Sequence, residues 1–198
     1  LNNINDESFK NCTKLRSIEI PDSVTFVGPN AFEGCNGLRK VVLSDNITVL
    51  NTNVFSDCTG LTRVEMPEQL EVINNGAFRN CTSLKTVELP DGVQTIHDAA
   101  FEGSGLRNIT IPSTVTKLAS ESNYENYRTS AFFNANKLTT VIFGDDMTNI
   151  PTRSLKDCSD VIEVILPESI TSIGYYAFLN CSAMVEIWIP EGVNAIEN

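Results

Sequence analysis

The chain has 198 residues, of which 41% are hydrophobic and 20% are charged, a composition typical of a folded domain and not of a disordered segment. Fourteen Lys and Arg against 25 Asp and Glu give a net charge of −11, which argues against sequence-independent nucleic-acid binding because that mode needs a basic surface. No apolar run approaches the roughly 18–20 residues of a membrane span. We therefore expect one acidic domain, with no nucleic-acid partner and no membrane span in this segment.

A 23-residue repeat runs through the chain, and each unit carries a large apolar residue followed three positions later by a small one. The large positions are Phe9, Phe32, Phe55, Phe78, Phe101, Phe132, Leu155 and Phe178, and the small ones are Cys12, Cys35, Cys58, Cys81, Ser104, Ala135, Cys158 and Cys181. The unit from Phe101 is one residue short, and about nine extra residues (119–127) precede the next unit. Because a unit of this length cannot bury its own apolar residues, we expect about eight units to stack into one solenoid over residues 1–198.

Within each unit, an alternating apolar pair follows the small residue and predicts a short strand of a parallel sheet. The pairs are Ile18/Ile20, Val41/Leu43, Val64/Met66, Val87/Leu89, Ile109/Ile111, Val141/Phe143, Val164/Leu166 and Ile187/Ile189. A proline normally follows the pair and ends the strand, because proline has no N–H to donate. The Ala-Phe-x-x-Cys stretch is too short for a long helix and predicts a single helical or 3₁₀ turn. The expected fold class is an α/β-type repeat solenoid with a parallel sheet on one face and helical or 3₁₀ turns on the other.

The repeat resembles a known family. The core Leu-x-x-Ile-x-Ile at Leu15–Ile20 is that of a leucine-rich repeat, and its continuation resembles the BspA-like subclass common on bacterial cell surfaces. Pro67–Cys81 (PEQLEVINNGAFRNC) and Pro167–Cys181 (PESITSIGYYAFLNC) show the continuation well. The resemblance implies a right-handed array, a cell-surface or secreted location, and attachment to a protein or other macromolecule on a host or neighbouring cell.

The residues that could carry chemistry form no catalytic constellation. The six cysteines point the same way in neighbouring units because of their spacing, so we expect buried free thiols and no disulfides. The single histidine, His97, follows the core residue Ile96, and we expect it in a solvated turn. Phosphate-binding loops, HExxH and G-x-S-x-G are all missing from the sequence. We therefore expect no enzymatic activity, no cofactor and no metal site.

An acidic residue follows the strand in seven of the eight units. These residues are Asp22, Asp45, Glu68, Asp91, Asp145, Glu168 and Glu191. Two interpretations stay open: the carboxylates cap the turn after each strand, which we favour, or they form a rim that collects Ca²⁺.

The outward-facing strand positions are the most informative about function, because the core does not fix them. The first five units are polar at these positions, whereas the last three carry Ile142, Ile165 and Trp188 in a line, which suggests a protein-binding patch. The predicted patch consists of Ile142, Ile162, Ile165, Val185 and Trp188, and secondary candidates are Arg39, Lys40, Arg63, Tyr124 and Tyr127. The alternative is that these β-branched and aromatic side chains pair across strands only to stabilise the sheet.

The sequence thus predicts a non-enzymatic protein-binding module of a cell-surface or secreted adhesion protein, which recognises a macromolecule through its sheet face. The alternative is a structural spacer or an accessory repeat domain of a larger surface protein or enzyme. Both ends fall inside a unit, so we expect a segment of a longer protein, and end-to-end self-association is a further partner hypothesis.

Overall fold

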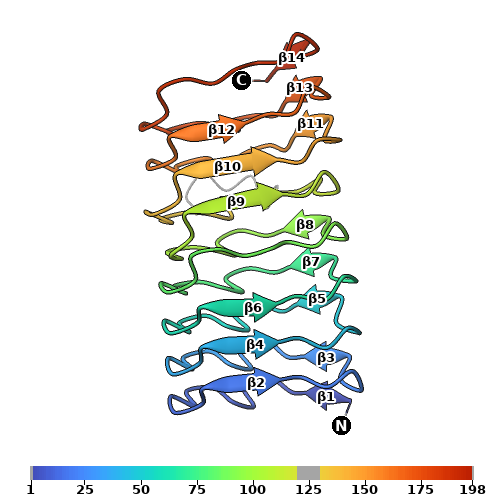
Figure 1. Ribbon diagram of the computed structural model, residues 1–198, viewed down its shortest axis with the longest axis vertical. Helices are drawn as coiled ribbons and strands as arrows, with labels where there is room; N and C mark the ends of the chain where they lie inside the picture. The colour runs from blue at the N-terminus through green and yellow to red at the C-terminus, as the bar shows by residue number, and fades with distance from the viewer. Residues whose placement is uncertain (1, 120–129, 198) are drawn as a thin grey trace.

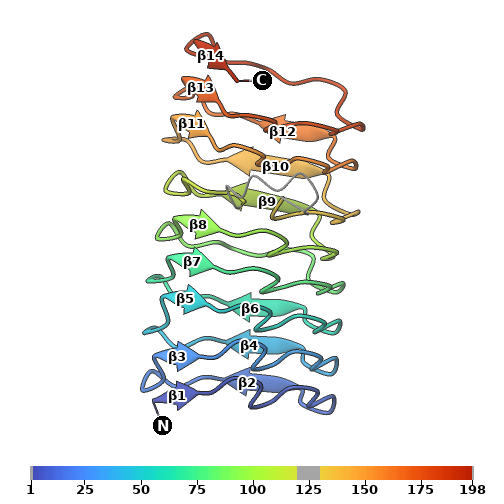
Figure 2. The ribbon, with the colours of Figure 1, turned by 180° about the vertical axis from the view of Figure 1, so that it is seen from behind.

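The structure, a computed structural model, describes residues 2–119 and 130–197 as a parallel-strand solenoid of about eight turns. Its short strands lie in two columns along the coil, and the two ends of the chain lie at opposite ends of the long axis (Figures 1 and 2). The first column contains β2 (Ser17–Glu19), β4 (Lys40–Val42), β6 (Arg63–Glu65), β9 (Asn108–Ile111), β10 (Thr140–Phe143) and β12 (Glu163–Ile165). The second contains β1 (Asn3–Ile4), β3 (Phe26–Val27), β5 (Val49–Leu50), β7 (Val72–Ile73), β8 (Thr95–Ile96), β11 (Asn149–Ile150), β13 (Ser172–Ile173) and β14 (Ala195–Ile196).

Strand pairing follows the repeat of the sequence. Residues 23 positions apart are partners in most pairs, as in Ser17↔Lys40 and Val49↔Val72, and every pair is parallel. The first column consists of two sheets, β2-β4-β6 and β9-β10-β12. They are separate because residues 85–89, in the turn between them, form no strand. The second column was not predicted as strands, because only two residues per turn take part in it.

The predicted helical or 3₁₀ turns and the α/β class are wrong, because residues 2–119 and 130–197 contain no helix. In the second turn, Asn30 (φ 55°) and Gly34 (φ 72°) both adopt the left-handed conformation. Only three residues lie between them, which is too few for an α-helix, and their i→i+3 bonds (Ala31 N–H to Gly28, Glu33 N–H to Asn30) are not consecutive, so no 3₁₀ helix forms either. Alternate N–H groups also bond to the next turn of the coil: Phe32 N–H donates to the carbonyl of Val54 at 2.9 Å. The backbone is therefore committed to bonds between turns and not to a helix.

A stack of phenylalanine rings forms the spine of the core. The six rings from Phe9 to Phe132 follow one another with centroids 5.1–5.7 Å apart and planes tilted by 4–16°. Phe101 and Phe132 are 31 positions apart in the sequence, yet their centroids lie 5.6 Å apart, so the spine continues past the inserted residues. Beyond Phe132 the buried Leu155 takes the equivalent position.

Within the described residues, no helix has the length and apolar character of a membrane span.

Candidate functional site

The predicted site lies on the sheet face, which we define as the outward side of the first strand column. The alternation along each strand points one set of side chains into the core and the other outward. In β12, for example, Glu163 and Ile165 are exposed while Val164 between them is buried. The short strands therefore act as rigid supports for outward side chains, and the alternation in the sequence identifies those side chains directly.

The apolar patch (Ile142, Ile162, Ile165, Val185 and Trp188) is largely exposed. Relative exposure is 85% for Val185, 59% for Trp188, 49% for Ile162 and 44% for Ile165, whereas Ile142 is half-buried. Ile142 and Ile165 are register partners on β10 and β12, so the structure places them side by side. Four of the five predicted residues thus offer apolar surface to a partner, and Ile142 supports them.

Ile165 and Trp188 also line one groove of about 440 Å³, the terminal groove, between β12 and residues 186–188. Residues 185–189 form no strand, and no backbone hydrogen bond joins them to residues 162–166 within the described parts of the chain. Glu163 and Glu186, which are 23 positions apart, are further lining residues of the groove. The patch therefore combines a hollow with an apolar rim and has carboxylates within the same groove.

The basic secondary candidates are held by neighbouring groups. The Glu65 carboxylate forms ion pairs with Lys40 and Arg63, each with an N···O distance of 3.0 Å. Its hydrogen bond with Lys40 is the main reason that the pKa of Glu65 is lowered. The Arg39 guanidinium donates to the backbone carbonyl of Gly60 at 3.2 Å. Arg39 and Lys40 therefore contact the next turn, whereas Arg63 pairs with Glu65 on its own strand, so all three cations already have partners. Tyr124 and Tyr127 lie outside the described residues.

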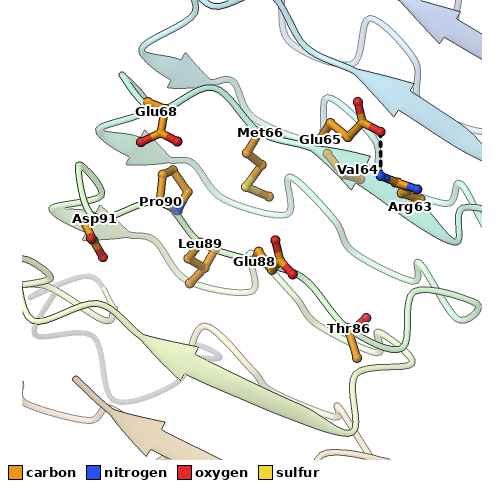
Figure 3. Close-up of a pocket in the computed structure, with 10 residues that line it drawn as sticks. All are labelled: Arg63, Val64, Glu65, Met66, Glu68, Thr86, Glu88, Leu89, Pro90 and Asp91. Atoms are coloured by element: carbon orange, nitrogen blue, oxygen red, sulfur yellow. Dashed lines mark ion pairs between the residues drawn. The ribbon is translucent and has the colours of Figure 1, made fainter. Parts of the chain in front are cut away.

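A second hollow, the central groove, was not predicted. It has a volume of about 520 Å³ and is lined by Arg63–Met66, Glu68, Thr86 and Glu88–Asp91 (Figure 3). Here residues 85–89 separate from β6. As a result, the inward-facing Val64 and Met66 are only half-buried, whereas the equivalent residues of the turn before, Val41 and Leu43, are at most 5% exposed.

Like charges offer a physical reason for this opening. Glu88 would be the register partner of Glu65, and opposed carboxylates weaken strand pairing. Lys40 and Arg63 are also like-charged partners, but they stay paired because Glu65 bridges them. No cation bridges Glu65 to Glu88 among the described residues. A Glu–Glu register pair is thus the sequence signal for the groove, and it recurs at Glu163 and Glu186.

The acidic column after the strands makes turn-capping bonds at its beginning. The carboxylate of Asp22 accepts the backbone N–H of Asp45 at 3.2 Å. Within residues 2–119 and 130–197, no three His, Cys, Asp or Glu side chains lie close enough together to hold a metal ion. His97 is half-buried in the turn after β8, and its backbone N–H donates to the carbonyl of Ile73 at 2.8 Å. Of these contacts, the bond from the Asp45 N–H supports capping as the role of Asp22.

All six cysteines are free, and five of them are buried; the exception is Cys12, which is exposed. The buried thiols donate to carbonyls of the turn before, as Cys58 Sγ does to Phe32 at 3.2 Å. Burial raises the pKa of the Cys58 thiol to about 12. These thiols therefore belong to the core and are not nucleophiles.

The raised pKa of Cys58 predicts a loss of stability at alkaline pH. The unfolded thiol ionises near pH 8.5 whereas the folded one stays neutral, so the contribution of Cys58 is complete below about pH 8.5 and falls as the pH rises toward 12. By pH 10 the loss should be about 2 kcal/mol. Guanidinium unfolding under reducing conditions at pH 8 and pH 10 should show that Cys58→Ala removes this part of the pH dependence and that Cys12→Ala keeps it. Identical pH dependence in both variants would contradict the assignment.

Comparison with known proteins identifies the fold. The model of the BspA type leucine-rich repeat region (6 copies) matches residues 2–129 and 121–198. A leucine-rich repeat protein from Bacteroides ovatus has a crystal structure that is similar with a TM-score of 0.67 and 25% identity, covering 100% of this chain and 66% of that one. The T. pallidum leucine-rich repeat protein gives a TM-score of 0.61 at 21% identity, covering 98% and 80%.

The pneumococcal vaccine antigen PcpA shares the fold with a TM-score of 0.52 at 18% identity, covering 100% of this chain and 54% of its own. This chain thus spans slightly less than two thirds of the Bacteroides structure and about half of PcpA. No curated protein matches it. Since the family model covers nearly the whole chain and the turns of the coil repeat with the same period, the chain belongs to the BspA-type leucine-rich repeat family.

Proposed function

We propose that this chain is a non-enzymatic protein-binding module of a cell-surface or secreted adhesion protein, which recognises a macromolecule on a host or neighbouring cell through its sheet face. Leucine-rich repeat proteins are generally interaction modules and generally non-catalytic. The surface location and the adhesion role rest on the resemblance to BspA-like repeats. The six free cysteines are compatible with this location, because the fold contains no disulfide that it would depend on.

The observation that carries this proposal is the exposure of the apolar patch. Ile162 and Ile165 expose 49% and 44% of their surface at β12, with the exposed Trp188 beside Ile165, on a scaffold whose other outward strand positions are mostly polar. Exposed apolar side chains that flank a groove are typical of binding surfaces, and tryptophan is one of the residues enriched at the energetic centre of interfaces. An extended, rigid row of outward side chains also suits the recognition of a large partner.

Substitution of the patch tests the proposal. Ile165→Ser combined with Trp188→Ser should weaken binding at least tenfold, because an interface hot spot contributes about 2 kcal/mol or more. The measurement is biolayer interferometry against a panel of extracellular-matrix proteins, together with flow cytometry on whole epithelial and bacterial cells. Trp188 is the only tryptophan, so a blue shift of its emission on binding reports contact with the partner directly.

The matched control changes two aromatic residues outside the sheet face. Phe26→Ser and Tyr175→Ser remove side chains of 40% and 49% exposure, in β3 and in the turn after β13, and should leave binding within twofold. Equal binding by the patch and control variants, or no binding by the wild type to any member of the panel, would count against the proposal. The second result would favour the spacer role.

A further inference from the structure

The central groove opens in the middle of the sheet face, at a distance from the apolar patch. Within the described residues, no backbone hydrogen bond joins residues 62–66 to residues 85–89, whereas on the other side of β6 the N–H of Leu43 donates to the carbonyl of Glu65 at 3.1 Å. The carbonyl oxygens of Thr62 and Val64 face this opening and accept no hydrogen bond from a described residue. The edge of β6 thus offers backbone carbonyls that no neighbouring turn uses, alternating with the N–H groups of Val64 and Met66, so the choice of ligand depends on the side chains around this edge.

The walls of the groove are apolar in the middle and acidic on both sides. Met66 and Leu89 lie between Glu65 and Glu88 on one side and Glu68 and Asp91 on the other (Figure 3). Met66 and Leu89 are half-buried, so they present carbon atoms to the groove without filling it.

Three of the four carboxylates have no partner in the part of the chain that the structure describes. Glu65 is neutralised by Lys40 and Arg63, but Glu68, Glu88 and Asp91 make no ion pair and no side-chain hydrogen bond with a described residue. All three are exposed. The groove therefore has an excess of negative charge and of hydrogen-bond acceptors, and Arg63, its one basic lining residue, is already paired.

From this combination we propose that the central groove binds an arginine side chain of a protein partner. The aliphatic stem of arginine packs on Met66 and Leu89, as long cationic side chains commonly pack on apolar surface. The guanidinium carries five N–H donors in a planar fork, which suits the carboxylate of Glu88 together with the free carbonyls of β6. Lysine presents three donors on one compact ammonium nitrogen and has no planar fork, so it matches a carboxylate and the strand carbonyls together less well.

This inference rests on the proposed protein-binding role and adds the chemistry of one contact to it. The central groove and the apolar patch share no residue, so the two can fail separately. Loss of arginine binding with an intact patch would remove only the groove, and the reverse result would remove only the patch.

The test is an NMR titration of ¹⁵N-labelled protein with the peptide Ac-Gly-Arg-Gly-NH₂. We expect saturable shifts confined to residues 62–66 and 86–91, with a dissociation constant in the millimolar range, as suits a single side chain. The isosteric neutral peptide with citrulline in place of arginine should produce no saturable shifts, and the lysine peptide should bind at least threefold more weakly. Shifts spread evenly over the acidic surface, or equal binding of the citrulline or lysine peptide, would overturn the proposal.

Matched variants separate the groove from the overall charge of −11. Glu68→Gln with Glu88→Gln and the control Glu19→Gln with Asp145→Asn each remove two negative charges from exposed positions. The groove variant should bind the arginine peptide at least fivefold more weakly and the control within twofold of wild type. An equal effect of both pairs would show nonspecific attraction and would overturn the proposal, as would unchanged binding in the groove variant.

Discussion

Phe78→Ala is expected to lower the free energy of unfolding by about 3–5 kcal/mol, a cost typical of emptying a buried phenylalanine site. Phe78 is fully buried, and its ring stacks between Phe55 and Phe101 at centroid distances of 5.7 and 5.3 Å. Its removal leaves a cavity that backbone bonds between turns prevent from closing, because Phe78 N–H donates to the carbonyl of Ala100 at 2.7 Å. Guanidinium unfolding followed by circular dichroism measures the loss.

The position of Phe78 in the coil adds a second expected effect. Each turn of a solenoid contacts only its neighbours, so the coupling between the two halves of the coil passes through every interface in turn. A cavity in the middle should therefore uncouple the halves and lower the denaturant dependence (m-value) as well as the midpoint.

Phe26→Ala is the control for this prediction, since Phe26 is 40% exposed and lies outside the ring stack. It should lower stability by less than about 1 kcal/mol and leave the m-value unchanged. Similar losses in Phe26→Ala and Phe78→Ala would contradict the role of the ring stack.

The period of the sequence made the spine and the strand register predictable. Residues one period apart become neighbours in any stacked coil, so the positions of Phe32, Phe55 and Phe78 alone imply the ring stack. The same argument made most of the apolar patch predictable. Alternation within a two- or three-residue strand is enough to place Ile165 outward and Val164 inward.

The local backbone of the turns was less predictable, although a signal exists. One series of left-handed residues recurs once per turn as Asn, Asp or Gly, the types that best tolerate positive φ. Its members are Asn11, Gly34, Asp57, Asn80, Gly103, Asn134, Asp157 and Asn180. A second series includes Glu7, Ala99, Arg153 and Tyr176, which have no such preference and conform only because the stacked turns impose the conformation. Composition alone therefore could not exclude a helical turn.

The opening of the central groove depends on pairs of residues and not on the period. A perfect repeat predicts that residues 86–89 pair with β6, and only the opposition of Glu65 and Glu88, without a bridging cation, argues against it. The half-burial of Ile142 depends likewise on its neighbours in the sheet. Such effects come from specific contacts between turns, which the pattern of one strand does not contain.

Gly105→Ala is the second substitution with a large expected effect, and it tests how closely the turns approach. A Cβ on Gly105 would overlap the carbonyl oxygen of Thr82 in the turn before and lie 2.8 Å from its carbonyl carbon. Both atoms belong to the backbone, so the added methyl group can be accommodated only if the turns move apart. We expect a loss of about 2–3 kcal/mol in the free energy of unfolding, in the upper range of overpacking effects.

Gly192→Ala is the matched control. Apart from the chain neighbours of Gly192, the atom nearest to the added Cβ would be the carbonyl oxygen of Ile170, at 3.2 Å. It should change stability by less than about 1 kcal/mol, since the smaller entropy of unfolded alanine offsets part of the crowding. The two variants add the same methyl group to turns of the same coil, so a difference between them in urea unfolding isolates the spacing of the backbone between turns. Equal losses of stability would contradict the prediction. They would show that the turns move apart easily at Gly105 and that close backbone stacking does not restrict this position to glycine.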